Sequence, residues 1–287
     1  MLAVLLALAT AVGYSGSDYA AGLAARRASV VRVTVLVEVA NTALLLAVVP
    51  LASSQAPSLR SLAWGSAAGV GGVAGALALY AGFRRASFSV VSSVSAVSAA
   101  AFSALTGLLL GERPGALSLA GIVLALPAIA GVSASAGQPE AGQPSGAGHA
   151  AGVTWGLIAG AGFGLFFISL NLAGSGTDLW PLAAAGVAGV AAVICVAAFT
   201  RQLGMPPAGS RWLSVLSGVT AAAGTLCYFL ATHRGLLAVT AVISSLYPAG
   251  TILLARVLSG ERLTALRIIG LSLAAASVAL IAAGGAG

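Results

Sequence analysis

Two carboxylic acids lie inside apolar stretches that are long enough to cross a membrane. Glu38 is near the middle of the run 31–51, with Asn41 one helical turn later, and Asp18 belongs to the run 2–24. Because ionisable side chains at membrane depth are costly, such residues mark functional sites by default. We interpret Glu38 as a coupling-ion site for a proton or another cation. We interpret Asp18 as a contact to a substrate amine or to the coupling ion.

Each acid also has a structural interpretation. Glu38 could cap a neighbouring helix or hydrogen bond to Asn41, and Asp18 could pair with Arg26 or Arg27 at the membrane interface. The sequence leaves both interpretations of each acid open.

Hydroxyl and aromatic side chains extend this set. Serines of the run 86–110 share one arc at about 100° per residue, which suits either a wet cavity or a seam between helices. Aromatic residues and Asn171 recur at spacings of three and four in the run 152–173, as in a solute pocket or a packed face. Pro248 exposes a carbonyl near Ser244 or bends its helix.

Tyr80 and Tyr228 precede basic pairs and could be gates of a cavity or interfacial anchors. The candidate solute-binding residues are Tyr14, Asp18, Tyr80, Ser92, Ser95, Phe163, Phe167, Asn171, Tyr228, Ser244 and Tyr247.

Residue sets for other chemistry are missing from the sequence. The six acids and two histidines fall mostly in different segments, so they form no expected catalytic or metal cluster. Cys195 and Cys227 lie in apolar runs and read as small buried hydrophobic residues. No Gly-Lys-Ser/Thr phosphate-binding motif occurs, which disfavours ATP-driven pumping. We therefore expect no enzyme, no cofactor and no metal.

The composition indicates that these residues are positioned by membrane helices. Hydrophobic residues make up 59% of the chain and charged residues 7%, against about 25% charged in soluble domains. The net charge of +7 comes from thirteen arginines, mostly placed between apolar runs, where they meet lipid headgroups rather than nucleic acid. We expect an all-α, multi-pass protein of the cell's inner (plasma) membrane, in contact with membrane lipid.

Ten apolar runs reach the length of about 20 residues that a membrane helix needs. The first is expected to be retained as a helix rather than cleaved as a signal peptide. The runs cover residues 2–24, 31–51, 62–82, 86–110, 116–135, 152–173, 180–200, 211–231, 236–258 and 264–284.

The chain repeats itself at an offset of 149 residues. Gly111-Glu112-Arg113 returns as Gly260-Glu261-Arg262, and at the same offset Gly13 matches Gly162 and Ser95 matches Ser244. We divide the chain into a first unit at 1–136, a flexible linker at 137–151 rich in Gly, Pro, Gln and Ser, and a second unit at 152–287. Because each unit holds five helices, an odd number, the second is expected to be inverted in the membrane.

The ten helices and the two Gly-Glu-Arg turns resemble the drug/metabolite transporter superfamily, EamA type. Gly16-Ser17-Asp18-Tyr19 and the segment 80–91 are similar to that family too. The resemblance implies solute transport by alternating access, often export of amino acids or related metabolites. It also implies cytoplasmic termini, whereas arginine counting places three arginines on the termini side and ten on the other. The orientation stays open.

We therefore expect a secondary active transporter of a small metabolite or drug-like compound, with the proton as a candidate coupling ion. The alternatives are a flippase for lipid or sugar conjugates and a membrane scaffold without transport activity. Monomer and homodimer are both open. The departures from the family, Gly13-Tyr14 in the first helix and Glu38 in the second, mean that the substrate is not to be borrowed from one relative.

Overall fold

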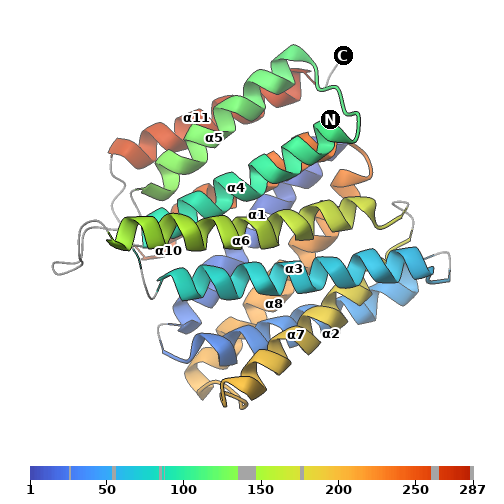
Figure 1. The fold of residues 1–287 in the computed structure, drawn as a ribbon, viewed down its shortest axis with the longest axis vertical. Coiled ribbons are helices and arrows are strands. Elements are labelled where there is room, and N and C mark those ends of the chain that lie inside the picture. The colour runs from blue at the N-terminus through green and yellow to red at the C-terminus, as the bar shows by residue number, and fades with distance from the viewer. Residues whose placement is uncertain are drawn as a thin grey trace.

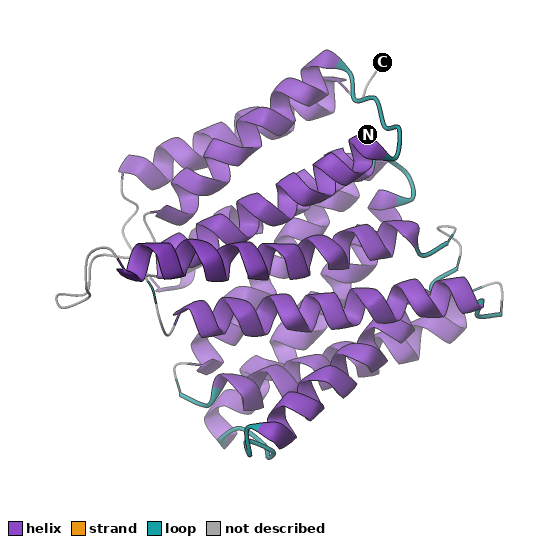
Figure 2. Ribbon diagram, in the orientation of Figure 1, coloured by secondary structure: helices purple, strands orange, loops and turns teal. Residues whose placement is uncertain are grey.

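The structure is a computed structural model that describes residues 1–25, 27–53, 56–83, 86, 88–134, 147–174, 178–259 and 265–284. Every regular element in these ranges is a helix (Figure 2). The helices are α1 (Leu2–Ala25), α2 (Val30–Ala52), α3 (Leu59–Phe83), α4 (Phe88–Leu109), α5 (Ala116–Ala134), α6 (Ala147–Leu172), α7 (Trp180–Phe199), α8 (Ala208–Thr232), α9 (Leu237–Ser244), α10 (Tyr247–Ser259) and α11 (Ala265–Gly284).

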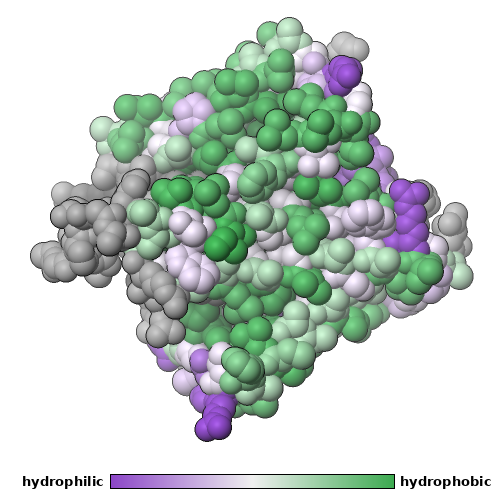
Figure 3. Space-filling view, in the orientation of Figure 1, coloured by the Kyte–Doolittle hydropathy of each residue, from purple (hydrophilic) through white to green (hydrophobic). Residues whose placement is uncertain are grey.

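The protein is a multi-pass membrane protein by the length and apolarity of these helices. Seven spans in the described residues are long and apolar enough to cross a membrane, one of them running through α9 and α10. Shorter apolar segments lie in α4, α5 and α11. Large apolar side chains are exposed along the helices, and hydrophobic surface dominates the face shown in Figure 3. Lipid is the solvent that fits such a surface.

The run expected as one helix over 236–258 is broken, which corrects the prediction. Pro248 has no N–H to bond to the carbonyl of Ser244, and its ring disfavours helical geometry at Tyr247. Accordingly α9 closes with the N–H of Leu246 bonded to the carbonyl of Ile243 at 3.1 Å. The helix restarts as α10, with Pro248 in its first turn, where the missing donor does no harm.

Glycines let the helices approach closely in two matching seams. A Cβ atom on Gly13 of α1 would lie 2.8 Å from Cα of Gly224 in α8, and one on Gly162 of α6 would lie 2.7 Å from Cα of Gly75 in α3. Added Cβ atoms cannot be held at such distances, so both seams require glycine. The offset of 149 residues converts one seam into the other.

Eight helical segments form a closed ring of neighbours. Around the ring, α1 contacts α8, followed by α2, α7, α3, α6, α4 and finally the α9–α10 segment, which returns to α1. The α5 and α11 helices pack against each other beside α4 and α10, at one edge of the bundle (Figure 1). Each link of the ring joins a helix before residue 135 to one after residue 146. The two halves of the sequence are therefore interlaced.

The ring has two ends. Both chain termini lie at one end, which we call the termini end (Figure 1). The α4–α5 connection is at the termini end, whereas α5 ends, α6 begins and α11 begins at the opposite end.

Candidate functional site

Asp18 is exposed on the inner side of α1. At about 100° per residue, Asp18 lies within roughly 20° of Ala7 and Ala11, which are buried, and more than about 100° from Leu5 and Val12. Leu5 and Val12 are 60% and 71% exposed and mark the lipid-facing side of the helix. The accessible surface of Asp18 therefore opens toward the inside of the ring rather than toward lipid.

No charged side chain in the described part of the chain offsets Asp18. The pairing with Arg27 that the sequence left open is not formed, and Arg26 lies outside the described residues. Its neighbour Ser17 bonds instead to Ser217 of α8, Oγ to Oγ at 2.9 Å.

Tyr14 lies one turn before Asp18 and joins three helices. Its hydroxyl hydrogen bonds to Oγ1 of Thr225 in α8 at 3.2 Å, and its ring meets the ring of Tyr247 in α10 edge to face at 6.3 Å. Asp18 and Glu38 both lie within electrostatic reach of the Tyr14 phenol. The first turn of α10 is held to α1 as well, because Ser15 Oγ donates to the carbonyl of Tyr247 at 2.8 Å.

Glu38 lies on the inner face of α2, on the arc that also carries Thr42 and Leu45. The Asn41 amide lies near its carboxyl group. A Cβ atom on Gly189 of α7 would stand 3.2 Å from Oε2 of Glu38, so the carboxyl group rests against bare backbone. Asp18 and Glu38 lie seven and eight residues from the opposite end of their helices, or about 10–12 Å.

Three of the expected solute-binding residues are instead engaged at the termini end. Tyr228 is fully buried in α8 and donates from its hydroxyl to the carbonyl of Phe167 at 3.1 Å, with ring centroids 4.6 Å apart. Asn171 Nδ2 donates to Oγ1 of Thr232 at 2.8 Å. His233 Nε2 bonds to the carbonyl of Gly174 at 2.8 Å. These contacts between the ends of α6 and α8 close the ring there, and we call them the termini-end gate.

The remaining candidates are spread around the ring. Phe163 is partly buried and packs against Gly75 of α3 and against a cluster of buried hydrophobic residues. Ser95 of α4 and Ser244 of α9 are fully buried, and neither Oγ has a hydrogen-bond partner. The side chains of Tyr80 and Ser92 lie outside the described part of the structure.

The Gly-Glu-Arg turn has a structural role that the sequence did not reveal. The carboxylate of Glu112 accepts hydrogen bonds from the backbone N–H groups of Leu237 and Ala238, the first two residues of α9. Gly111 has φ +95°, and a Cβ atom on Gly107 would collide with the carboxylate at 2.3 Å. Glu112 therefore caps a helix of the other half. Gly260-Glu261-Arg262 lies outside the described residues.

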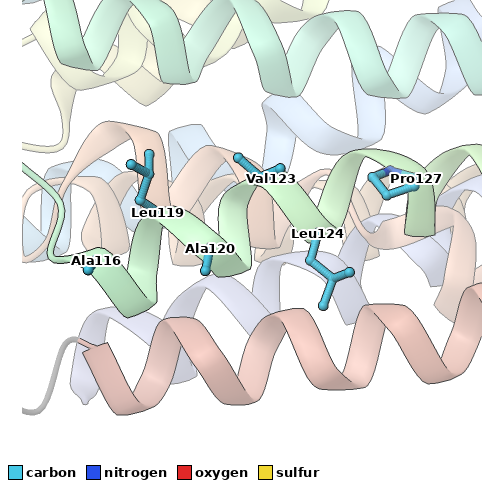
Figure 4. Close-up of a pocket in the computed structure, with 6 residues that line it drawn as sticks. All are labelled: Ala116, Leu119, Ala120, Val123, Leu124 and Pro127. Atoms are coloured by element: carbon cyan, nitrogen blue, oxygen red, sulfur yellow. The ribbon is translucent and has the colours of Figure 1, made fainter.

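Two apolar hollows lie away from the acids. One, of about 500 Å³, runs along the outside of α5 and is lined by Leu119, Val123, Pro127 and their neighbours (Figure 4). The other, of about 210 Å³, lies between α1, α10 and α11. Neither brings a charged group to a ligand, so lipid chains suit them better than a polar solute does. No three His, Cys, Asp or Glu side chains come together as a metal site in the described ranges.

Comparison with known proteins gives one family and one fold. Residues 150–283 match the family model of the EamA-like transporter family. No curated protein matches the sequence. A crystal structure of another protein superposes with a TM-score of 0.72 over 96% of this chain and 98% of that chain, at 17% sequence identity. At that identity the likeness shows a shared fold.

Proposed function

Because its second half belongs to the EamA-like transporter family, within the drug/metabolite transporter superfamily, we propose that this membrane protein is a secondary active exporter. It moves a small metabolite or drug-like compound across the plasma membrane by alternating access. The observation that carries the proposal is Asp18, a carboxyl group with no charged partner among the described residues, exposed on the inner arc of a membrane helix. A solute that brings an amine to this carboxylate explains why the acid is retained there.

The architecture that we propose is ten spans in two inverted five-span units, at 1–136 and 152–287, joined by the linker 137–151. The contacts support it, because the offset of 149 residues converts the α1–α8 pair into α6–α3 and the α2–α8 pair into α7–α3. The placement of the α4–α5 connection and the start of α11 at opposite ends also supports inversion (Figure 1). Sites in transporters of this kind lie between the repeats.

Alternating access is supported by the unequal ends of the ring. The termini-end gate joins α6 to α8 through the Tyr228 and Asn171 hydrogen bonds. At the other end, Asp18 is exposed on the inner arc of α1. The offset places Asp18 in register with Phe167, a residue of the gate. We infer that the solute enters from the opposite end and leaves when the termini-end gate opens.

The roles of the candidate residues follow from their positions. Asp18 and Tyr14 contact the solute, with Tyr247 and Phe163 supplying aromatic surface beside them. Ser95 and Ser244 belong to the walls of the path. Phe167, Asn171 and Tyr228 form the gate.

Purified protein provides the test. Thermal unfolding is measured with a library of amino acids, amines, sugars, nucleosides and cationic drugs, for the wild type and for Asp18→Asn. The compounds that stabilise the wild type then serve as radiolabelled probes of flux in proteoliposomes. Amine-bearing compounds should stabilise the wild type, and Asp18→Asn should remove that effect and lower flux at least tenfold.

Asp178→Asn is the matched control. Asp178 is a buried acid whose Oδ1 accepts from the backbone N–H of Trp180 at 3.0 Å, and an asparagine oxygen preserves that bond. The control should transport like the wild type. Equal flux in Asp18→Asn and the wild type would remove Asp18 from the path and the proposal with it.

A further inference from the structure

Oxygen atoms with unused hydrogen-bonding capacity gather on α2 beside Glu38. Glu38, Asn41 and Thr42 stand at positions i, i+3 and i+4, which share one helix face. The Asn41 side chain lies near the Glu38 carboxyl group, and its Oδ1 is buried without a hydrogen-bond partner among the described residues. Thr42 is 6% exposed, and its Oγ1 is also buried without a partner.

Two of these side chains, Thr42 and Glu38, face the backbone of α7 at two glycines. A Cβ atom on Gly186 would lie 2.8 Å from Thr42 Oγ1, and one on Gly189 would lie 3.2 Å from Glu38 Oε2. The carbonyl oxygen of Gly69 in α3 lies 3.7 Å from the latter point. Oxygen atoms from α2 and α3 therefore lie next to α7 where α7 contributes no side chain. Along this face α2 carries one carboxyl group, one amide oxygen and one hydroxyl, and α3 adds the carbonyl oxygen of Gly69.

A buried polar atom without a partner costs about 1–3 kcal/mol. Native structures seldom leave two side by side, and an ion or water is a common explanation. Hard cations bind carboxylate, carbonyl and hydroxyl oxygen. With a single carboxylate in this seam, the charge balances one positive charge rather than two.

We propose that Glu38, Asn41 and Thr42 bind Na⁺ in the seam between α2 and α7. The ion takes up the free oxygen atoms of Asn41 and Thr42 and neutralises Glu38. This site is separate from Asp18, which lies on α1 and is exposed. A coupling role for the ion rests on the proposed transport function, but the binding itself does not.

Ion-dependent stability tests the binding without any transport assay. Purified full-length protein is unfolded thermally in NaCl, KCl or choline chloride at equal ionic strength. Because an ion that binds only the folded state stabilises it by RT ln(1 + [L]/Kd), the midpoint should rise with Na⁺ and saturate. K⁺ should act weakly and choline not at all. Equal midpoints in the three salts would overturn the proposal, and leave Glu38 with a proton as its partner.

Two variants with a matched control locate the site. Thr42→Val keeps the shape and removes the free hydroxyl, and Glu38→Gln removes the charge; each should raise the Na⁺ concentration for half-maximal stabilisation at least tenfold. The control is Thr34→Val on the same helix, where Thr34 is equally buried but already bonds to the carbonyl of Val30 at 2.9 Å. It should respond to Na⁺ like the wild type. A Na⁺ response unchanged in both Thr42→Val and Glu38→Gln would place the ion elsewhere and refute this site.

The same variants separate the two proposals. Na⁺-dependent stability that persists while no compound is transported would support the ion site and sink the transport function. Flux that is independent of Na⁺, together with salt-independent stability, would support the transport function and refute the ion site.

Discussion

The carboxylate of Glu112 accepts a hydrogen bond from the backbone N–H of Ala238 at 2.9 Å, although 126 residues separate them. The same carboxylate also accepts a hydrogen bond from the backbone N–H of Leu237. The N-cap residue of α9, Leu236, has no side chain that can do this. A loop of the first half thus supplies the cap for a helix of the second half, at its positive dipole end.

Glu112→Ala should lower the free energy of unfolding by about 1–2 kcal/mol, as expected for the loss of a helix cap. The free energy of unfolding of Glu112→Gln should lie between those of Glu112→Ala and the wild type, because the amide keeps one acceptor oxygen. Arg113→Gln is the control: Arg113 bonds only to carbonyl groups of its own turn at the surface. Denaturation in detergent micelles gives all three values. An alanine variant as stable as the control would show that the cap contributes nothing.

Gly69→Ala should prevent close packing of α3 on α7. A Cβ atom there would lie 2.1 Å from the carbonyl oxygen of Ala185, so the helices must separate, at a cost of about 1–3 kcal/mol or more. Gly22→Ala in α1 is the matched control, since nothing lies within 4 Å of its added Cβ atom. The free energy of unfolding of the control should rise by about 0.5–1 kcal/mol, because alanine favours the helical conformation more than glycine does. Size-exclusion profiles and melting curves compare the two, and a Gly69→Ala protein as stable as Gly22→Ala would contradict the seam.

Tyr228→Phe should loosen the termini-end gate while keeping its ring in place. The lost hydrogen bond to Phe167 is worth about 0.5–1.5 kcal/mol, so the open state should become roughly 2–10 times more populated. A cysteine in place of the buried Ser169, in a background without Cys195 and Cys227, reports this as a faster reaction with a methanethiosulfonate. Thr200→Val, at the far end of α7, should leave the labelling rate unchanged. Equal rates in the two variants would exclude Tyr228 from the gate.

The arginine distribution predicts which end faces the cytoplasm. At the termini end the described arginines are Arg60, Arg113 and Arg234, and at the opposite end they are Arg27, Arg32, Arg201, Arg211, Arg256 and Arg267. Positively charged connections stay in the cytoplasm. We therefore expect both termini outside, which would leave Asp18 accessible from the cytoplasm, as an exporter requires.

Reporter fusions at residue 287 decide the orientation. Alkaline phosphatase should be active there and green fluorescent protein dark, and the same two reporters inserted after residue 140 should give the opposite result. A fluorescent C-terminal fusion would reverse the orientation, and Asp18 would then open to the outside.

The helices could be predicted from the sequence because apolar runs of membrane length are unmistakable. The predicted run 31–51 is α2 at Val30–Ala52, and 180–200 is α7 at Trp180–Phe199. The sequence predicts one helix over 236–258 that Pro248 could bend, whereas the structure ends α9 at Ser244 and starts α10 at Tyr247. Hydropathy averages over a window and cannot register one absent N–H group.

The candidate site was harder to predict, since its members are defined by partners from other helices. The position of Glu38 inside an apolar run marks it as a candidate in the sequence. The Thr42 hydroxyl becomes a candidate only in the structure, where it faces Gly186. Tyr228 and Asn171 have the residue types of a pocket, and in the structure they hydrogen bond to Phe167 and Thr232. The role of Glu112 cannot be predicted from spacing, because the N–H groups that it caps belong to the second half of the chain.

The interlaced ring also constrains how the protein is made. The four ring helices of the first half leave the ribosome before any of their neighbours in the ring exist, so their glycine-lined faces stay uncovered in the bilayer until the second half is made. Synthesised alone, either half should be degraded. When the two halves are expressed together from two genes divided within 137–145, they should associate in the membrane and resist degradation, because each half supplies the ring neighbours of the other.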